Sequence, residues 1–301
     1  MHRFGKHPIA AGLLLATASA ASLALQAPAG GAAAAEAEGQ ADCPIGPYAQ
    51  SAAEYDYVSR GARLLQADNA ADDHKARALY EKGLKAFPQS VWMKTGLAWT
   101  YLHEITFIRS ADPKSDIDHA YALATEAAVA NDALGGAAWR NHLALVALFW
   151  LHDGDAARTA AEAEIVHRQM ADDPQTNSFI AAWMGAAGRI DTAIAWAEWA
   201  AKAQPDGPGW IKGNRGMVYY FAGRYQDALE DLKPAADLYP DMLSATYIRL
   251  GREDDARATV ATWRKADPSA TITKMLTMFP LAPDIKAKYV ADMTRAGLPE
   301  S

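Results

Sequence analysis

The stretch Gly223-Arg224-Tyr225-Gln226-Asp227-Ala228-Leu229 decides the fold of this chain, because its opening recurs. Ala-Gly-Arg stands at 187–189 and again at 222–224, and Leu-Gly-Arg follows at 250–252. Each copy opens a helix-like segment that ends at a proline, namely Pro205, Pro240 or Pro268. Self-similarity with a period of about 34 residues is typical of helical repeat architectures. The recurrence therefore predicts an all-α chain of stacked helix–turn–helix units.

The unit at 209–242 carries the pattern of a known repeat most completely. The residues at the expected offsets are Gly216, Tyr219, Gly223, Tyr225, Ala228, Leu232, Ala235 and Pro240. The chain thus resembles a tetratricopeptide repeat protein, whose unit follows Trp-x2-Leu-Gly-x2-Tyr, then Ala-x3-Phe, Ala and Pro. The resemblance covers roughly residues 55–270. It implies a right-handed superhelical solenoid of about six helix–turn–helix repeats with a C-terminal helical cap.

Small residues in this unit would let two helices approach closely. Ala228 is therefore expected between two helices, with no room for a larger side chain, and Asp231 is expected to face solvent. Residues 271–301 leave the repeat pattern and are predicted to form the capping segment. A cap needs a polar outer face, which Lys286, Lys288, Asp292 and Arg295 would supply.

Two features resemble a narrower subgroup. They are the insertion Leu102–His119 and the tail that ends Arg295-Ala296-Gly297-Leu298-Pro299-Glu300. Both are similar to the repeat half that lies behind cyclase or DNA-binding regulatory domains in many proteobacterial proteins. This sequence carries the repeat half with a different N-terminus, so a relic of a larger regulator that lost its output domain is one alternative.

The first 35 residues have the layout of a secretory signal peptide. Arg3 and Lys6 precede an uncharged run from Ile9 to Leu25, and small residues follow from Ala29 to Ala35. Cleavage is predicted after Ala35, with Ala29 or Ala37 as alternatives, to give a periplasmic or secreted mature protein with no stable membrane insertion. The alternative is an uncleaved anchor, because an apolar run of this length is near the lower limit for spanning a bilayer. Residues 36–54 read as a flexible linker, because they have little to bury.

The charge of the chain narrows the class of partner. Removal of residues 1–35 leaves 27 basic and 36 acidic residues, a formal net charge of −9. An acidic surface argues against nucleic acid as the partner. The single cysteine, Cys43, excludes an intramolecular disulfide framework, and it is interpreted as incidental or as able to form an intermolecular disulfide.

Chemistry-bearing motifs are sparse. His103, Asp112, Asp116, Asp118 and His119 cluster around the insertion, but without the spacing of metal ligands. Asp116 or Asp118 is expected to cap the following helix, and the histidines are expected to be solvated. No phosphate-binding loop or nucleophile motif is present, so no cofactor, metal or catalytic residue is predicted.

The resemblance implies a candidate binding groove. In this family the first helix of each pair lines a concave face, and inward positions carried over residue by residue are Tyr101, Asn141, Phe149, Trp210, Met217, Tyr220 and Phe221. An aromatic and Met-rich groove suits an extended peptide or an inserted helix. The alternative is that these aromatics pack on each other or on the C-terminal tail.

These observations predict a non-catalytic periplasmic scaffold or adaptor that binds a protein or peptide in its concave groove. A small-ligand-binding or enzymatic role, with loop 102–119 as a lid over the groove, is the alternative from another class. The lack of a catalytic constellation favours the scaffold.

Overall fold

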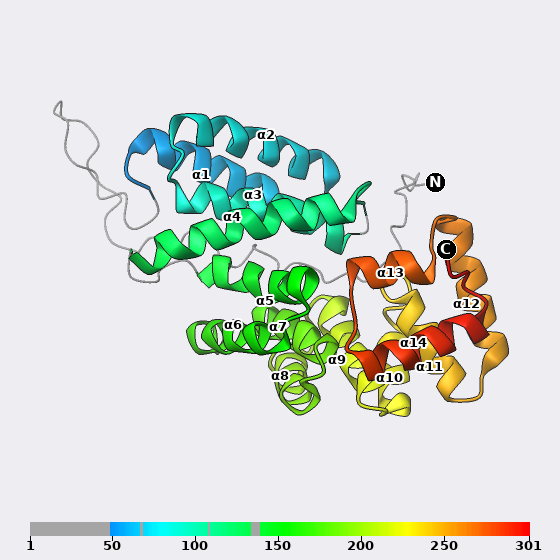
Figure 1. The fold of residues 1–301 in the computed structure, drawn as a ribbon. Helices are drawn as coiled ribbons and strands as arrows, with labels where there is room; N and C mark the ends of the chain where they lie inside the picture. Colours follow the sequence, from blue (N-terminus) through cyan, green and yellow to red (C-terminus); the bar gives the residue numbers. More distant parts are fainter. Residues whose placement is uncertain (1–48, 67–68, 108, 134–138) are drawn as a thin grey trace, which may run out of the picture.

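The computed structural model describes residues 49–66, 69–107, 109–133 and 139–301 (Figure 1). The predicted signal peptide, Cys43 and most of the predicted linker lie outside this part of the chain. Within it there are fourteen helices and no strand. The first twelve are α1 Ala52–Leu65, α2 Ala70–Ala86, α3 Val91–Thr106, α4 Pro113–Ala133, α5 Trp139–Asp153, α6 Ala156–Gln169, α7 Pro174–Ala186, α8 Ile190–Ala203, α9 Gly209–Phe221, α10 Tyr225–Leu232, α11 Pro240–Arg249 and α12 Glu253–Ala266. The last two are α13 Ile272–Met278 and α14 Pro283–Ala296.

The helices pack as consecutive pairs. Each odd-numbered helix from α1 to α11 packs on the even-numbered helix that follows it, and each pair packs on the next. Six pairs are thus followed by α13 and α14 (Figure 1). This pairing confirms the prediction of an all-α helical repeat solenoid.

The recurring glycine marks the turn inside a pair. Gly188, Gly223 and Gly251 have φ angles of 82°, 80° and 73°, and Gly154 has the same left-handed conformation at the turn between α5 and α6. A side chain at such a φ is strained, whereas glycine is not. Each of these glycines therefore ends the first helix of its pair and lets the second turn back.

The insertion at 102–119 does not form the predicted loop. Its residues lengthen α3 to Thr106 and begin α4 at Pro113, so most of the insertion is helical. The cap of α4 is also different from the expected one, since Asp112 Oδ1 accepts the Ser115 amide at 3.2 Å. The expectation that His103 is solvated is wrong, because it lies in the buried part of the extended α3.

The two expectations for α10 have opposite outcomes. Ala228 is fully buried, as expected. Asp231 is only 6% exposed, so its predicted solvent-facing position is wrong. Asp231 lies three residues after Ala228 and therefore shares its face of the helix. It receives two hydrogen bonds, both 2.7 Å long, from Nε and Nη2 of Arg215 on α9.

Candidate binding site

The first helices of the pairs form the inner layer of the array. Neighbouring members of the series α1, α3, α5, α7, α9 and α11 touch one another, whereas the second helices contact one another far less. A stack that is tighter on one side curves toward that side. A concave binding surface would therefore lie on this inner layer.

The seven predicted groove residues do not come together as one open surface. Tyr101 is partly exposed, and the other six are buried. Asn141 ties α5 to its neighbours, because its side-chain amide donates to the Ala124 carbonyl at 2.9 Å and its Oδ1 accepts from Thr95 at 3.1 Å. Tyr220 donates to Asp292 at 2.7 Å. These side chains have packing and hydrogen-bonding partners inside the protein.

The C-terminal segment, residues 271–301, supplies several of those partners. Between α13 and α14 the chain crosses the inner layer of the middle pairs. There Trp150 Nε1 donates to the Pro280 carbonyl at 2.6 Å, and the Ala282 amide donates to the Ala186 carbonyl at 2.8 Å. The Phe279 ring lies 4.7 Å from the Trp183 ring between their centres. An extended stretch of this chain thus lies where the resemblance would place a bound peptide.

Helix α14 covers the later pairs in a similar way. It packs against α11 (Figure 1), where Asp292 accepts hydrogen bonds from Tyr220 and from Arg249 Nε at 2.6 Å. Lys288 Nζ donates to the Phe221 carbonyl at 3.1 Å. Burial and the Asp292 carboxylate raise the pKa of Tyr220, so its hydroxyl stays protonated and serves as a donor. The C-terminal segment therefore packs across the inner layer instead of only capping its end.

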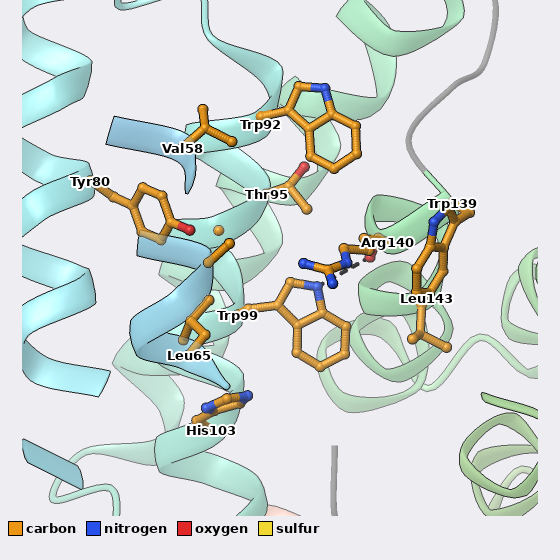
Figure 2. Close-up of a pocket in the computed structure, with 12 residues that line it drawn as sticks. Val58, Leu65, Tyr80, Trp92, Thr95, Trp99, His103, Trp139, Arg140 and Leu143 are labelled. Atoms are coloured by element: carbon orange, nitrogen blue, oxygen red, sulfur yellow. Dashed lines mark hydrogen bonds between the residues drawn. The ribbon is translucent and has the colours of Figure 1, made fainter. Parts of the chain in front are cut away.

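A cavity remains at the other end of the inner layer, among α1, α2, α3 and α5 (Figure 2). We call it the Trp pocket. It encloses about 70 Å³, several times the roughly 15 Å³ that a single water molecule needs. The lining residues are Val58, Ala62, Leu65, Tyr80, Trp92, Thr95, Gly96, Trp99, His103, Trp139, Arg140 and Leu143.

Tyr80 forms the back of the Trp pocket and depends on two glycines. Its ring reaches from α2 to a place between α1 and α3. A Cβ atom on Gly61 would lie 2.3 Å from the ring, and one on Gly96 would lie 2.4 Å from it. Burial raises the pKa of Tyr80, which keeps the phenol neutral. Glycine at both positions is therefore what admits the ring.

Three indoles form the walls. Trp92 and Trp139 are half-buried, and Trp99 is buried with its Nε1 donating to the Arg140 carbonyl at 3.2 Å. The Arg140 guanidinium lies between Trp99 and Trp139 (Figure 2), with its central carbon 5.6 Å from the centre of the Trp139 ring. The pocket thus combines a broad aromatic surface with one permanently charged group.

His103 lies at the lower end of the pocket in Figure 2 and belongs to a buried polar cluster. Its Nδ1 is 2.8 Å from Asp73 Oδ1, and Arg109 Nη2 donates to Asp73 Oδ2 at 2.5 Å. Burial acts to raise the pKa of Asp73, but the hydrogen bonds and charges of His103 and Arg109 outweigh it and lower the pKa. Because the ionised carboxylate only accepts, His103 Nδ1 carries the proton.

The residues that line the Trp pocket carry few groups that take part in covalent catalysis. The only aliphatic hydroxyl among the twelve residues belongs to Thr95, and it already donates to Asn141. No cysteine or serine stands beside His103 in this lining, so the nucleophile–base pair that covalent catalysis uses does not form there. Across the described ranges no group of three His, Cys, Asp or Glu side chains has a metal-binding arrangement. Within those ranges no helix is long and apolar enough to cross a membrane.

Among the lining residues, only His103 was singled out from the sequence. A usable signal was present, since Trp92 and Trp99 are seven residues apart and share one face of a helix. The sequence does not indicate that Trp139 and Arg140, at the start of α5, lie next to that face.

The sequence matches no protein-family model and no curated protein. Among solved structures it is similar to TTC0263, a thermophilic tetratricopeptide repeat protein of Thermus thermophilus, with 16% identity over 80% of this chain and 99% of that one, and a TM-score of 0.38. It is also similar to yeast Tom70, with 14% identity over 83% of this chain and 67% of that one, and again a TM-score of 0.38. The assignment of an all-α repeat solenoid stands on the helix pairing described above.

Proposed function

We propose that this protein is a non-catalytic binding scaffold, and that the Trp pocket receives an apolar side chain of a protein or peptide partner. The supporting observation is an aromatic cavity on the inner layer at the end that the C-terminal segment leaves uncovered. Buried aromatic anchors in pockets provide most of the affinity in protein interfaces. The described lining also lacks a nucleophile–base pair, which favours binding over the alternative of an enzyme.

The most direct test introduces a larger side chain that fills the pocket. Ala62 lies on α1 and lines the cavity, and leucine is nearly as good a helix former as alanine. Peptides are selected from a displayed random library on the wild type, synthesised, and titrated against Ala62→Leu. We expect affinity to fall at least about tenfold, because the added side chain takes the space of the anchor. The thermal midpoint should change by only a few degrees.

Two further variants control for the interpretation. Trp92→Ala removes a wall of the pocket and should weaken the same peptides. Trp199→Ala removes a 38% exposed indole on α8, outside the pocket, and should leave their binding unchanged. Equal binding by wild type and Ala62→Leu would place the partner site elsewhere. Selection of no peptide, together with binding of small aromatic compounds that Ala62→Leu abolishes, would favour the small-ligand alternative.

Export is a separate part of the proposal and rests on the order of residues 1–35. A mature chain that begins near Glu36 should be released into the periplasm of a bacterial host. Mass spectrometry of the protein from periplasmic and membrane fractions tests this. Recovery of the intact chain from Met1 in the membrane fraction would support the uncleaved anchor.

A further inference from the structure

The Tyr80 hydroxyl is a polar group of the Trp pocket that has no hydrogen bond. Tyr80 is only 2% exposed, and within the described part of the chain its hydroxyl makes no hydrogen bond. A buried hydroxyl normally has a partner, because the loss of its water without a replacement costs free energy. A ligand of the pocket would supply the missing partner.

This hydroxyl is held in place and faces the cavity. A Cβ atom on Gly61 would lie 2.6 Å from the hydroxyl oxygen, and one on Gly96 would lie 2.7 Å from it. In Figure 2 the hydroxyl points from α2 toward the space beside Thr95 and Trp99, which also line the pocket. A group confined in this way loses little freedom when a ligand binds, so more of the hydrogen bond appears as affinity.

Other polar groups of the lining are already engaged. The Thr95 hydroxyl and the Trp99 indole N–H donate to acceptors within the protein. Trp92 and Arg140 also have partners within the protein. Burial raises the pKa of Tyr80, so its hydroxyl stays protonated and can donate. Tyr80 is thus the residue that would distinguish between ligands by a hydrogen bond.

We infer that the Trp pocket recognises a tyrosine side chain of a peptide segment, with the ring among the indoles and its hydroxyl bonded to that of Tyr80. This rests on the proposed function and names the anchor, whose ring is its apolar part. Indole walls offer edge-to-face partners to an aromatic ring, and the cavity of about 70 Å³ suits the outer part of a single ring. A phenol both donates and accepts, so it can pair with Tyr80 in either direction.

The same features disfavour other anchors. Phenylalanine would fill the walls but leave the Tyr80 hydroxyl unpaired, and a site that binds a hydroxyl discriminates against the analogue that lacks it. Serine and threonine offer a hydroxyl but little apolar surface for the indoles. Leucine has neither the ring nor the hydroxyl. Tyrosine alone among these side chains matches both the walls and the polar group.

The test uses the full chain and three blocked peptides, each acetylated and amidated and otherwise made of glycine and serine. Their central residue is tyrosine, phenylalanine or leucine. Binding is followed by NMR through the indole N–H signals of Trp92, Trp99 and Trp139, assigned with single Trp→Phe variants. We expect the tyrosine peptide to bind roughly five- to tenfold more tightly than the phenylalanine peptide, and the leucine peptide to bind most weakly.

Variants that lack one hydroxyl then assign the preference. Tyr80→Phe should bind the tyrosine and phenylalanine peptides with equal affinity, close to that of the wild type for the phenylalanine peptide. Its thermal midpoint should stay within a few degrees of the wild type, because the hydroxyl has no partner to lose in the free protein. Tyr219→Phe is the control, because it removes a hydroxyl that donates to Glu198 on α8, and it should keep the wild-type preference.

The outcomes separate this inference from the proposed function. Equal binding of the tyrosine and phenylalanine peptides to the wild type would overturn the tyrosine preference and leave the pocket as a peptide site. A tyrosine preference that persists in Tyr80→Phe would overturn the role of this hydroxyl. Absence of indole shifts with every peptide would overturn both proposals. Tighter binding of para-cresol than of the tyrosine peptide would overturn the commitment to a peptide. If Tyr80→Phe does not fold, the order of the three peptides on the wild type still decides the preference.

Discussion

Tyr80 shows how a single side chain determines the packing of three helices. Its ring passes between Gly61 of α1 and Gly96 of α3, and an added methyl group on either glycine would overlap it. An atom at the far end of a flexible side chain usually moves aside at little cost. Here Gly96 lies on the opposite side, so a ring displaced from Gly61 would be pushed against α3.

Gly61→Ala is therefore expected to destabilise the protein by about 2 kcal/mol, even though alanine is the better helix former. The matched control is Gly209→Ala, because Gly209 also lies in a helix and a Cβ there meets nothing within 4 Å. That change should be neutral or stabilise by about 0.5 kcal/mol. Urea unfolding of both variants checks the pair. Equal stability of the two would mean that Tyr80 is not held as described.

Individual residues also show which features could be predicted from the sequence and which could not. The glycines of the Gly-Arg repeats predicted the turns, because a left-handed φ requires glycine and this requirement is local. Asp231 was placed on the surface because charged side chains usually are. Its burial follows from Arg215 on another helix, and a pairing between helices leaves no local trace in the sequence.

Among the secondary-structure elements, the C-terminal segment makes contacts that were expected from the sequence only as the alternative for the groove aromatics. Its length and helical content were predicted, but the prediction placed it at the end of the array. The Trp150–Pro280 hydrogen bond and the Phe279–Trp183 ring contact place part of it across the middle pairs. No repeat pattern describes such a segment, because its position depends on the groove that it fills.

Trp150→Phe removes the indole N–H that binds the Pro280 carbonyl. We expect a loss of about 1–2 kcal/mol in the free energy of unfolding, because a part-buried carbonyl loses its donor. Trp199→Phe, at an exposed position of α8, should cost less than about 0.5 kcal/mol. Chemical denaturation measures both. A loss of similar size in both variants would indicate that tryptophan burial in general, and not this contact, accounts for the effect.

Helix α14 also covers a buried acid at the start of α11. Asp241 is fully buried, its Oδ2 accepts the Tyr289 hydroxyl at 3.2 Å, and its Oδ1 has no partner. Burial raises the pKa of Asp241 to about 6, against hydrogen bonds from Tyr289 and the local backbone that lower it. The unfolded chain releases this proton near the ordinary value of 3.8. Between these pH values the folded state binds more protons, so the contribution of Asp241 to stability falls as the pH rises through this window.

Asp241→Asn removes the ionisation while keeping the shape of the side chain. At pH 8 the variant should be more stable than the wild type by roughly 3 kcal/mol, and at pH 4 the two should be nearly equal. Urea unfolding of both proteins from pH 4 to pH 8 gives this difference directly. A variant that is less stable than the wild type at pH 8 would show that the carboxylate is well accommodated in its charged form.

At the scale of the whole molecule the array has two principal apolar cores of unequal size. The larger extends from Ala98 to Leu298 and is joined across the inner layer by the C-terminal segment. The smaller is formed by Val58, Ala76, Tyr80, Met93 and Leu97. In repeat proteins stability comes from each unit and its neighbours, so a small terminal core opens first.

Amides of α1 and α2 should therefore exchange with solvent at least roughly tenfold faster than those of α7 and α9. Hydrogen exchange measured by mass spectrometry under native conditions tests this. Binding of a peptide in the Trp pocket should slow the exchange of α1, because Ala62 and Leu65 line that pocket. Uniform protection along the chain would show that the two cores unfold as one.

The site was less predictable than the fold for a reason that applies to the whole array. Repeat patterns specify which residues pack inside a unit, and they predicted six pairs. The Trp pocket is made by α1, α2, α3 and α5 together, and Arg140 enters it from the third pair. Convergence of this kind depends on how successive pairs are rotated against each other, which the repeat pattern does not encode.

The Trp150–Pro280 contact has a consequence for the order in which the protein can be completed. The two residues are 130 positions apart. A ribosome adds roughly 5–20 residues per second, so on the order of 10 s separates their appearance. During that interval the middle pairs can form helices, but Trp183 and its neighbours have nothing to cover them. Closing so long a loop is also entropically slow. A newly made chain therefore passes through a stage at which the segment that covers this apolar surface has not yet been synthesised. A chaperone that shields apolar surface would act at that stage.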